Sequence, residues 1–377
     1  MKIMLARDRN VLNTNWLVYY ANLLAERGHE VVIACDTYSK LGNLAPSFSL
    51  HQNVRVANLS GKVENNKIVD FYHRVRAKAI PAYFRFNELI KKEKPEMIVC
   101  YFPVDLFNIT RFQNHNIPIV LMVHNWPPLI LDKYLKKSNL IKWFYKMSFQ
   151  KIGAFHVLLP SFAFDIDKWY EPKHIEVIAN PVEQIKDKDI ADLSVEKKKI
   201  IYITRIEKSV KQPHVLVEAF NKIAKEFPDW KVEIYGLRKY PDYDKEIMDF
   251  IKNNGLENQV FLMGYSKDLP SVYRGADIHA FPSNCEGFSL AIADAMAYGL
   301  PHIGFKHAHS INEVIIDGHN GFLADDIDDF ANKLKTLMID KELRIKMGQN
   351  ARNDMKNYAP NVIIDKWEKL LNEVVKK

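Results

Sequence analysis

One stretch in the second half of the chain constrains the fold more than any other. It runs from Asp277 to Leu300 and begins with a short apolar run that a proline and a serine close after Phe281. After a polar loop, apolar residues return at helical spacing until Gly299 stops them: Leu290, Ile292, Ala293, Met296 and Ala297. This pattern predicts a buried strand, a loop, and a helix that begins near Ser289.

A strand, a loop and a helix in this order form a ready site for an anion. Unpaired N–H groups and the positive end of the helix dipole point to one place, and Gly287 lets the backbone approach a ligand closely. Glu286 precedes the helix, and Asp294 lies about two turns later on the same side. Acids beside an anion site suggest that sugar hydroxyls bind there.

These residues resemble the Glu-x7-Glu signature of the retaining glycosyltransferases of family 4. The resemblance rests on three short segments: Glu286 to Leu290, Asp294 to Ala297, and Gly299 to Pro301. It implies the α/β architecture called GT-B, in which two doubly wound Rossmann-like domains face a cleft. It also implies transfer of a hexose-type sugar from a nucleotide diphosphate to a hydroxyl, with the anomeric configuration retained.

In that family the first acid lies beside the transferred sugar and the second bonds the nucleotide ribose. The resemblance therefore assigns Glu286 to the catalytic centre and Asp294 to the donor. Asp294 stands where the family usually has glutamate, and this departure concerns the ribose contact rather than the reaction class. For an isolated pair of acids, capping and solvating a helix is the alternative role.

Length and composition fit two domains. The chain has 377 residues, of which 47% are apolar, and that is enough for two cores. No run of about twenty apolar residues occurs, and Met1 leads directly into a strand-like segment, so we expect a cytoplasmic protein. Cys35, Cys100 and Cys285 show no metal-ligand spacing and no disulfide framework, and we expect them to be reduced and structural.

The first half has the pattern of a parallel sheet. A strand at 2–6, a helix at 15–26 and a strand at 31–35 form its first unit. Further strands are predicted at 54–57, 97–101, 117–123, 155–159 and 174–178. The loop from Arg7 to Thr14 lacks the glycine pair that the family often has, so Asn13 or Asn15 would contact the ligand there, unless both only cap the helix and line a solvated loop.

Domain boundaries follow from composition and from the resemblance. The turn at Ala179 to Val182 resembles the one that ends the first half in the family, and the charged stretch from Lys186 to Lys199 has linker composition. We expect an acceptor-side domain over 1–190 and a nucleotide-sugar domain over 191–358. The resemblance implies that 359–377 is a helix returning to the first domain.

His124 directly follows the predicted strand 117–123. Ligands of open parallel sheets bind beyond the carboxyl ends of the strands, where this residue falls. Family 4 members similarly carry a histidine after this strand, near the donor sugar, so the resemblance adds His124 to the catalytic centre. A loop histidine with satisfied hydrogen bonds is the alternative.

The second half restarts the strand and helix pattern at 200–204. Arg205, Lys208 and Lys211 follow that strand, before a helix predicted at 214–226. In the family an arginine and a lysine in this loop hold the diphosphate, because fixed cations stabilise the departing charge. Alignment of the helix matches Lys211 to that lysine, although the loop is one residue longer than usual and Lys208 remains a competitor.

The rest of the donor site comes from three further segments. Strands are predicted at 231–235 and 259–263, with a helix at 244–253 between them. The loop at Gly264 and Tyr265 resembles the one whose backbone bonds the nucleotide base, and it does not itself distinguish uracil from guanine. The predicted donor-binding set is Arg205, Lys211, Gly264, Tyr265, Gly287, Phe288, Ser289, Leu290 and Asp294.

Neither a metal nor another cofactor is expected. His302, His307 and His309 cluster in sequence, but no carboxylate or cysteine completes a recognisable ligand spacing. Related enzymes work without metal, and the nucleotide sugar is a substrate. From Phe330 the chain is predicted to be helical to its end, with an apolar stripe of Trp367, Leu370, Leu371 and Val374.

A basic, aromatic segment predicts contact with an anionic membrane surface. Six lysines lie between residues 133 and 151: Lys133, Lys136, Lys137, Lys142, Lys146 and Lys151. Aromatic residues such as Trp143 and Phe144 alternate with them, and a helix-like stretch at 72–94 adds Arg74, Arg76, Lys78 and Arg85. The alternative is a solvated helix face whose aromatic rings pack inward. No nucleic-acid-binding motif occurs, so no nucleic-acid partner is expected.

Together these features predict a retaining hexosyltransferase that uses a UDP-sugar in preference to a GDP-sugar. The expected acceptor is a glycan or lipid-linked glycan in cell-surface polysaccharide assembly, such as lipopolysaccharide or capsule, at the cytoplasmic face of the membrane. One alternative is a non-catalytic partner that keeps the fold and binds a nucleotide sugar or glycan. Another is a membrane-surface scaffold built on the segment 133–151.

Overall fold

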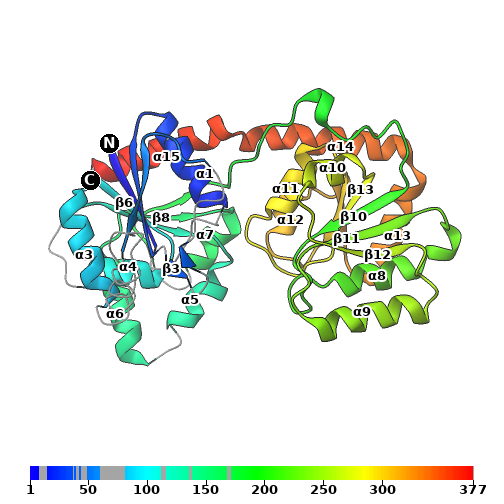
Figure 1. The fold of residues 1–377 in the computed structure, drawn as a ribbon, viewed down its shortest axis with the longest axis horizontal. Coiled ribbons are helices and arrows are strands. Elements are labelled where there is room, and N and C mark those ends of the chain that lie inside the picture. Colours follow the sequence, from blue (N-terminus) through cyan, green and yellow to red (C-terminus); the bar gives the residue numbers. More distant parts are fainter. Residues whose placement is uncertain are drawn as a thin grey trace. The chain divides into compact units, whose positions relative to one another are not determined.

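The chain forms two compact units, each built on one sheet. The computed structural model describes residues 1–7, 15–36, 38–39, 42–43, 49–59, 81–111, 116–135, 138–167 and 171–376, without the side chains of 15–16, 38–39, 42–43 and 133–135. The first unit comprises Met1–Ala179 and Ile363–Lys377, and the second comprises Asn180–Val362. Figure 1 shows both units, coloured along the chain.

The first unit has a parallel sheet of seven strands in the order β5-β2-β1-β6-β7-β8-β9. The strands are β1 (Lys2–Ala6), β2 (Glu30–Cys35), β5 (Val54–Asn58), β6 (Met97–Cys100), β7 (Ile119–Val123), β8 (Ala154–Val157) and β9 (Ile175–Val177). The central strands consist almost entirely of buried residues, as expected for strands covered by helices on both faces. The strand order reverses between β1 and β6.

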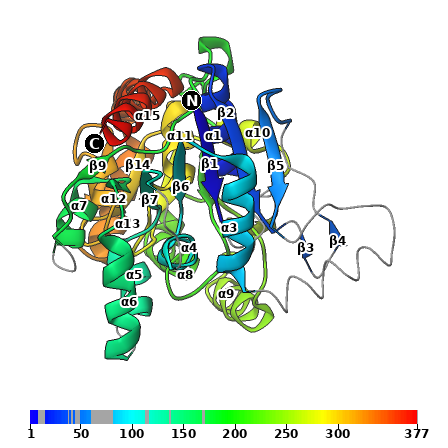
Figure 2. The ribbon, with the colours of Figure 1, turned by 90° about the vertical axis from the view of Figure 1, so that its left-hand side faces the viewer.

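Helices connect these strands. They are α1 (Asn15–Glu26), α3 (Ala82–Glu93), α4 (Pro103–Thr110), α5 (Pro127–Leu135), α6 (Asn139–Phe149) and α7 (Pro160–Asp167). Two short strands, β3 (Tyr38–Ser39) and β4 (Gly42–Asn43), pair antiparallel outside the sheet. Figure 2 shows α6 extending away from the sheet of this unit.

The second unit has a parallel sheet of six strands in the order β12-β11-β10-β13-β14-β15. They are β10 (Lys199–Ile203), β11 (Lys231–Tyr235), β12 (Val260–Gly264), β13 (Ile278–Phe281), β14 (His302–Phe305) and β15 (Gly321–Ala324). The α-helices are α8 (Pro213–Asn221), α9 (Pro241–Asn253), α10 (Leu269–Arg274), α11 (Leu290–Ala297), α12 (Ile311–Val314), α13 (Ile327–Ile339) and α14 (Lys341–Met355). Three single turns of 3-10 helix lie at Asp187–Asp189, Ala224–Glu226 and Lys356–Tyr358.

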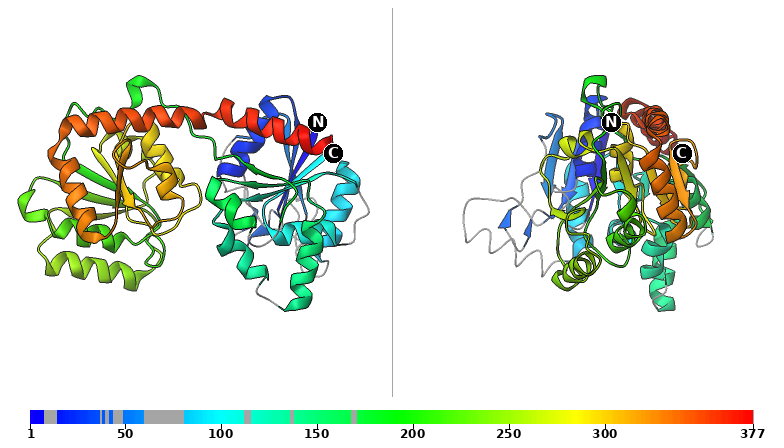
Figure 3. Two further views of the ribbon diagram at one scale, coloured as in Figure 1. Left: turned by 180° about the vertical axis from the view of Figure 1, so that it is seen from behind. Right: turned by 90° about the vertical axis from the view of Figure 1, so that its right-hand side faces the viewer.

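The last helix, α15 (Pro360–Val375), packs most of its length on the first unit. Its predicted apolar stripe is fully buried, and the Trp367 ring lies 5.6 Å from the Tyr20 ring. Arg27 on the first unit pairs with Asp365 and Glu368. In Figure 3 this red helix lies beside the blue N-terminal strands.

The segment 180–190 packs on the second unit. The Val182 N–H donates to the Tyr358 carbonyl at 2.8 Å, and the Gln184 amide donates to the Met355 carbonyl at 3.0 Å. The predicted domain boundary near residue 190 placed these residues in the first domain. The chain therefore passes from the first unit to the second at Ala179, before its charged stretch rather than within it.

Most predicted strands are confirmed to within two residues, and several helices differ. From Phe330 onward the chain is mostly helical, as predicted, but it divides into separate helices. Asp340 ends α13 and caps α14 by accepting from the Leu343 N–H at 2.9 Å, and a 3-10 turn at Lys356–Tyr358 separates α14 from α15. The helix predicted at 214–226 ends at Asn221. The described part of the stretch 72–94 forms α3, which begins at Ala82, while Arg74, Arg76 and Lys78 lie outside the described residues.

Two further expectations concern charge and cysteine. Arg85 was assigned to a basic surface, but it is buried on α3 and its guanidinium lies 3.7 Å from the Asp36 carboxylate. Cys35, Cys100 and Cys285 are all free. Within the described ranges, no helix combines the length and apolar character that crossing a membrane requires.

Candidate active site

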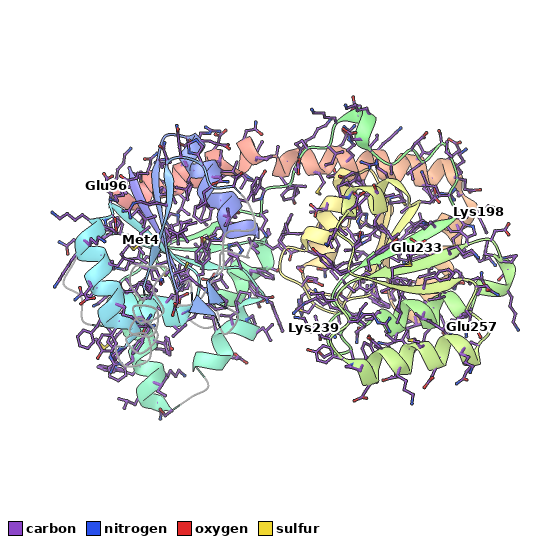
Figure 4. All side chains as sticks on the ribbon, in the orientation of Figure 1. Met4, Glu96, Lys198, Glu233, Lys239 and Glu257 are labelled. Atoms are coloured by element: carbon purple, nitrogen blue, oxygen red, sulfur yellow. The ribbon has the colours of Figure 1, made fainter. Side chains whose placement is uncertain are left out.

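The strand order of the second unit fixes where a ligand can bind. β10 and β13 are neighbours, while the chain runs outward from β10 to β11 and β12 on one side and from β13 to β14 and β15 on the other. Loops that leave the carboxyl ends of such a pair diverge and leave a crevice for a ligand. Lys239, in the loop after β11, marks this carboxyl edge in Figure 4, whereas Lys198 and Glu257 lie at the opposite edge.

At this edge, Lys211 and Glu286 form an ion pair. Lys211 comes from the loop after β10, and Glu286 comes from the loop after β13. Their side chains are only 13% and 10% exposed, so water screens the pair poorly. The sequence predicted a site role for each residue, and the structure brings the two together.

Hydrogen bonds join the two loops beneath this ion pair. The Tyr202 hydroxyl donates to the Lys211 carbonyl at 2.6 Å and bonds the Ser283 hydroxyl at 2.8 Å. The Asn284 N–H donates to the Val210 carbonyl at 3.0 Å, and its side-chain amide donates to the Ser209 carbonyl at 3.1 Å. These hydrogen bonds hold together the two loops that carry Lys211 and Glu286.

The N-terminus of α11 follows Glu286 directly. Ser289 is the N-cap residue, and its side chain makes no capping hydrogen bond, so the first N–H groups of the helix are open to a ligand. Leu290 is the first helical residue, and Gly287 and Phe288 form the preceding bend. Phe288 is buried with its ring 5.3 Å from that of Tyr358, so only its backbone can face a ligand.

Asp294 lies in the middle of α11, eight positions after Glu286 in the sequence. Burial and the nearby Glu183 carboxylate raise its pKa to about 7. A substantial fraction of this carboxyl group is therefore protonated near neutral pH, and it can donate as well as accept a hydrogen bond.

The other two cations of the β10 loop are held differently from Lys211. Arg205 is 68% exposed and reaches Glu207 at 3.9 Å. Lys208 is bound by both carboxylate oxygens of Glu246 on α9, at 2.6 and 2.8 Å. Arg205 can therefore swing toward an anion, whereas Lys208 is already engaged at an exposed pair with α9.

The loop after β12 lies at the same edge, two strands from β10. Gly264 has φ = 76°, and its carbonyl accepts the N–H of Gly236 at 2.8 Å. A Cβ on Gly236 would come within 1.6 Å of the Thr204 carbonyl oxygen, so glycine is required there for the β11 loop to cross the β10 loop. Tyr265 is exposed, which is compatible with contact to a nucleoside.

His124 lies in a cluster of rings in the first unit. Its ring is 6.2 Å from Tyr20, 5.9 Å from Tyr101 and 5.7 Å from His156. Burial and the neighbouring His156 hold the pKa of His124 well below its ordinary value. The imidazole is therefore neutral at physiological pH and acts as a hydrogen-bonding group rather than as a cation.

Other residues singled out in the sequence have different positions. His302 is buried on β14, where it faces His279 of β13 with the rings 4.8 Å apart, while His307 and His309 are exposed. Over the described ranges, no group of three or more potential metal ligands occurs. Asn13 and the side chain of Asn15 lie outside the described residues.

Sequence reasoning missed the residues that support the ion pair. Tyr202 lies within an apolar strand and resembles any core aromatic, and Ser283 resembles a turn residue. Their hydroxyl groups meet across 81 positions of the chain, and no local pattern encodes that.

Two protein-family models match this chain, and they meet close to the boundary between the two units. Residues 14–184 match the family model described as Glycosyltransferase Family 4, and residues 183–354 match the model described as Glycosyl transferases group 1. The architecture is the GT-B fold, and the two family models together identify a glycosyltransferase. The chain belongs to the family 4 type of these enzymes.

The alignments with curated relatives cover different shares of those proteins. The chain is 24% identical over 361 residues to an uncharacterized glycosyltransferase of Haemophilus influenzae, which covers 93% of each. It is 24% identical over 375 residues to an undecaprenol-linked-glycan alpha-1,4-N-acetyl-D-galactosaminyltransferase of Campylobacter jejuni, covering 95% of this chain and 94% of the relative. A poly(glycerol-phosphate) alpha-glucosyltransferase of Bacillus subtilis is 27% identical over 196 residues, which are 52% of this chain and only 28% of that protein.

Solved structures share the fold at low identity. The sucrose-phosphate synthase of Thermosynechococcus elongatus superposes with a TM-score of 0.78 at 15% identity, covering 99% of both chains. Staphylococcus aureus TarM, in a complex that contains UDP, superposes with a TM-score of 0.75 at 15% identity, covering 98% of this chain and 99% of TarM. Anabaena HepE in complex with UDP gives 0.74 at 18% identity, covering 99% and 100%.

Proposed function

We propose that this enzyme moves a hexose-type sugar from a nucleotide diphosphate to an acceptor hydroxyl and retains the anomeric configuration. A UDP-sugar is favoured over a GDP-sugar. One observation carries the proposal: the Lys211–Glu286 ion pair lies at the carboxyl edge between β10 and β13, directly before the uncapped N-terminus of α11. The site thus offers a cation, a carboxylate and backbone donors together.

The cations and the helix N-terminus stabilise the leaving group. A nucleoside diphosphate gains negative charge as its bond to the sugar breaks, and fixed positive groups lower the energy of that transition state. Lys211 holds the diphosphate from the β10 loop, Arg205 closes on it from solvent, and the N–H groups from Phe288 to Leu290 complete the cradle. Binding of the donor replaces the contact between Lys211 and Glu286.

Glu286 then contacts the transferred sugar. The C1–O bond breaks and its electron pair stays on the diphosphate oxygen, while the acceptor oxygen attacks C1 from the same face. The acceptor proton passes to the departing phosphate oxygen, so the products are the glycoside and the nucleoside diphosphate. No protein nucleophile is needed. The role near the donor sugar that the family resemblance assigns to His124 would be that of a neutral hydrogen-bonding group, because burial and the neighbouring His156 lower the pKa of this imidazole.

The nucleoside occupies the outer part of the same edge. Asp294 holds the ribose, and its pKa of about 7 lets the carboxyl group donate as well as accept a hydrogen bond to hydroxyls. The backbone at Gly264 and the exposed ring of Tyr265 contact the base. Support for uracil comes from two relatives of this fold, TarM and HepE, which are in complexes with UDP.

The proposed acceptor is a glycan or a lipid-linked glycan in cell-surface assembly. The relative from C. jejuni acts on an undecaprenol-linked glycan, and the relative from B. subtilis acts on poly(glycerol-phosphate). Their identities to this chain are low, so they support the acceptor class rather than a particular linkage.

A donor panel tests the proposal. We expect a UDP-sugar such as UDP-glucose or UDP-N-acetylglucosamine to raise the melting temperature more than GDP-mannose does, and to be slowly hydrolysed without acceptor. Glu286→Gln should bind UDP and lose turnover by about 100-fold or more, the size typical for removing one preorganised group. Glu246→Gln, which alters the exposed partner of Lys208, serves as the matched control.

The outcomes separate the candidate functions. Stabilisation by a nucleotide sugar with no turnover, for wild type and across acceptors, would identify a binding partner instead of an enzyme. Turnover that Glu286→Gln leaves within about threefold of wild type would remove that residue from the reaction, since losing a preorganised group costs far more.

We propose further that the first unit docks on an anionic membrane through α6. Leu140, Trp143 and Met147 share one face of this helix and are 64%, 53% and 41% exposed. Lys142 and Lys146 are also exposed, whereas Tyr145 and Phe149 are buried against the unit. The aromatic residues of α6 therefore lie on both the buried and the exposed face of the helix. The exposed face combines apolar and basic side chains, as the helices that bind at membrane interfaces do.

Vesicle sedimentation tests this docking. We expect binding to vesicles of phosphatidylcholine with phosphatidylglycerol at low salt, and release at high salt, because exposed charges are screened. Lys142→Glu with Lys146→Glu should abolish binding and keep donor hydrolysis, while Lys225→Glu with Lys346→Glu, exposed lysines of the second unit, should not change it. Equal binding by both double variants would refute a role for α6. Lys136 and Lys137, also predicted here, lie outside the described residues, as does the side chain of Lys133.

A further inference from the structure

We infer that Tyr202 and Ser283 are positioning residues for the donor reaction, because their hydroxyl groups fix Lys211 opposite Glu286. The inference rests on the proposed role of Lys211 and extends it to two residues that would not contact the donor. It concerns the hydrogen-bonded link under the ion pair, which joins the two loops on either side of the strand-order reversal.

Tyr202 is placed to act on both loops at once. It is the penultimate residue of β10, is fully buried, and packs its ring against Phe281 of β13 at 5.1 Å. Its hydroxyl reaches the Lys211 carbonyl from the β10 loop and the Ser283 hydroxyl from the β13 loop. A single buried atom therefore sets the spacing of the loops that carry the cation and the carboxylate.

The directions of these hydrogen bonds are fixed by chemistry. The Lys211 carbonyl can only accept, so the single proton of Tyr202 goes to it, and the Ser283 hydroxyl must donate to the Tyr202 oxygen. Burial raises the pKa of Tyr202, so this phenol stays protonated and remains a donor. Both side chains are buried, and removal of either hydroxyl leaves a polar group without its partner.

The backbone beside Lys211 needs such support. Gln212, the next residue and the N-cap of α8, has φ = 49°, a left-handed conformation that non-glycine residues rarely adopt. It makes no side-chain capping bond, and its N–H donates to the Glu207 carbonyl at 3.0 Å. Without the contact from Tyr202, the Lys211 backbone can relax away from this conformation and carry the ammonium group with it.

A double-mutant cycle tests the inference. Tyr202→Phe keeps the ring and removes only the hydroxyl. We expect it to lower turnover of the best nucleotide sugar from the donor panel by about 10- to 100-fold, the size that small misplacements of catalytic groups produce. In a Lys211→Ala background the same change should lower turnover no further, because the group that Tyr202 positions is gone.

Two companion variants separate positioning from general stability. Tyr235→Phe removes a hydroxyl from the neighbouring strand, where it bonds Glu233 at 2.6 Å, and should leave turnover unchanged. Ser283→Ala keeps the hydrogen bond from Tyr202 to Lys211 and removes only the link to the β13 loop. It should lower turnover in the same direction by a smaller factor, and it replaces Tyr202→Phe if that variant does not fold. The rise in melting temperature caused by UDP should shrink with Tyr202→Phe and Ser283→Ala, and not with Tyr235→Phe.

Each remaining outcome decides a different claim. If Lys211→Ala loses turnover while Tyr202→Phe behaves like Tyr235→Phe, the positioning role is refuted and the proposed function stands. Losses that multiply in the double variant would show that Tyr202 acts independently of Lys211 and would also refute it. If Lys211→Ala keeps full turnover and UDP response, the positioning role and the proposed role of Lys211 both fail.

Discussion

Lys211 and Lys208 lie three positions apart in one loop and meet different partners. Lys211 is largely buried against Glu286, whereas Lys208 is exposed and bound by Glu246 of α9. Exposed ion pairs contribute little, since water and salt screen them, while enclosed charges act strongly on a nearby anion. The geometry therefore favours Lys211 as the residue that meets a diphosphate.

This difference predicts unequal effects of two matched substitutions. Lys211→Ala should weaken UDP binding and slow donor turnover by about 100-fold or more, as loss of a preorganised charge does, while Lys208→Ala should change either by less than about threefold. Calorimetric UDP titration and released UDP measure the two quantities. A larger loss with Lys208→Ala would show that the donor rearranges this loop.

The sequence motifs identified Glu286, Lys211 and Asp294 as site residues, but they did not show which of these side chains contact one another. Glu286 and Lys211 were assigned by separate motifs, and the contact between them spans 75 positions. The raised pKa of Asp294 depends on burial and on Glu183, which no motif includes. Burial and long-range proximity determine these properties, and both appear only when the sheet is assembled.

At the level of elements, α11 owes its position to close packing against α14. Gly348 lies inside α14, and a Cβ there would come within 2.1 Å of the Gly299 carbonyl oxygen just after α11. Glycine inside a helix costs about 1 kcal/mol relative to alanine, so propensity alone would favour alanine at this position. The approach of the two backbones explains why glycine is present.

Gly348→Ala should therefore destabilise the second unit despite its better helix propensity. Overpacking typically costs about 1–3 kcal/mol, which exceeds the propensity gain, and the steric clash involves backbone that cannot rotate away. Urea denaturation measures the loss. Gln349→Ala, at the next and exposed position, should be neutral or slightly stabilising. If Gly348→Ala is as stable as this control, α11 and α14 can separate freely.

The elements themselves were predicted unevenly. The strand Ile119–Val123 was located well, because buried parallel strands form continuous apolar runs between turn residues. The helices α4 and α7, with eight residues each, were missed, since two turns give too few repeats to show a period. The break at Asp340 was missed because the apolar pattern continues across it.

Across the described part of the molecule, burial lowers the pKa of four enclosed histidines, two in each unit: His124, His156, His279 and His302. Burial lowers the pKa of His156 and of His302 to about 4, and holds those of His124 and His279 well below the ordinary value. The unfolded chain binds these protons near pH 6.5 and the folded chain does not. The four neutral rings therefore cost no folding free energy above about pH 6.5, and the folded state loses stability relative to the unfolded chain as the pH falls toward 4.

We expect the free energy of unfolding to drop by several kcal/mol between pH 7.5 and pH 5, at about 2 kcal/mol per buried histidine. Asp294 and Asp277 act in the opposite direction, because burial raises the pKa of each and acid protonation then favours the folded state; they offset part of the histidine effect. Urea denaturation at several pH values measures the slope.

Two variants test whether the buried histidines cause this decrease in the free energy of unfolding at acid pH. Both nitrogens of His279 lack a hydrogen-bond partner among the described residues, so His279→Met should keep stability at pH 7.5 and flatten the acid slope. His307→Gln, at an exposed position, should leave the slope unchanged. An unchanged slope with His279→Met would mean that this ring titrates normally.

The packing of α15 on the first unit also governs the order of events during synthesis. Trp367, Leu370 and Leu371 complete the first core, and Trp367 lies against the His156 ring at 4.6 Å, beside His124. These residues follow the entire second unit, Asn180–Val362, which takes roughly 10–40 s to translate. During synthesis, the apolar surface of the first unit that α15 covers therefore stays without α15 until the second unit has been translated. The apolar surface that α15 covers beside His156 and His124 is therefore exposed to other apolar chain segments throughout that interval.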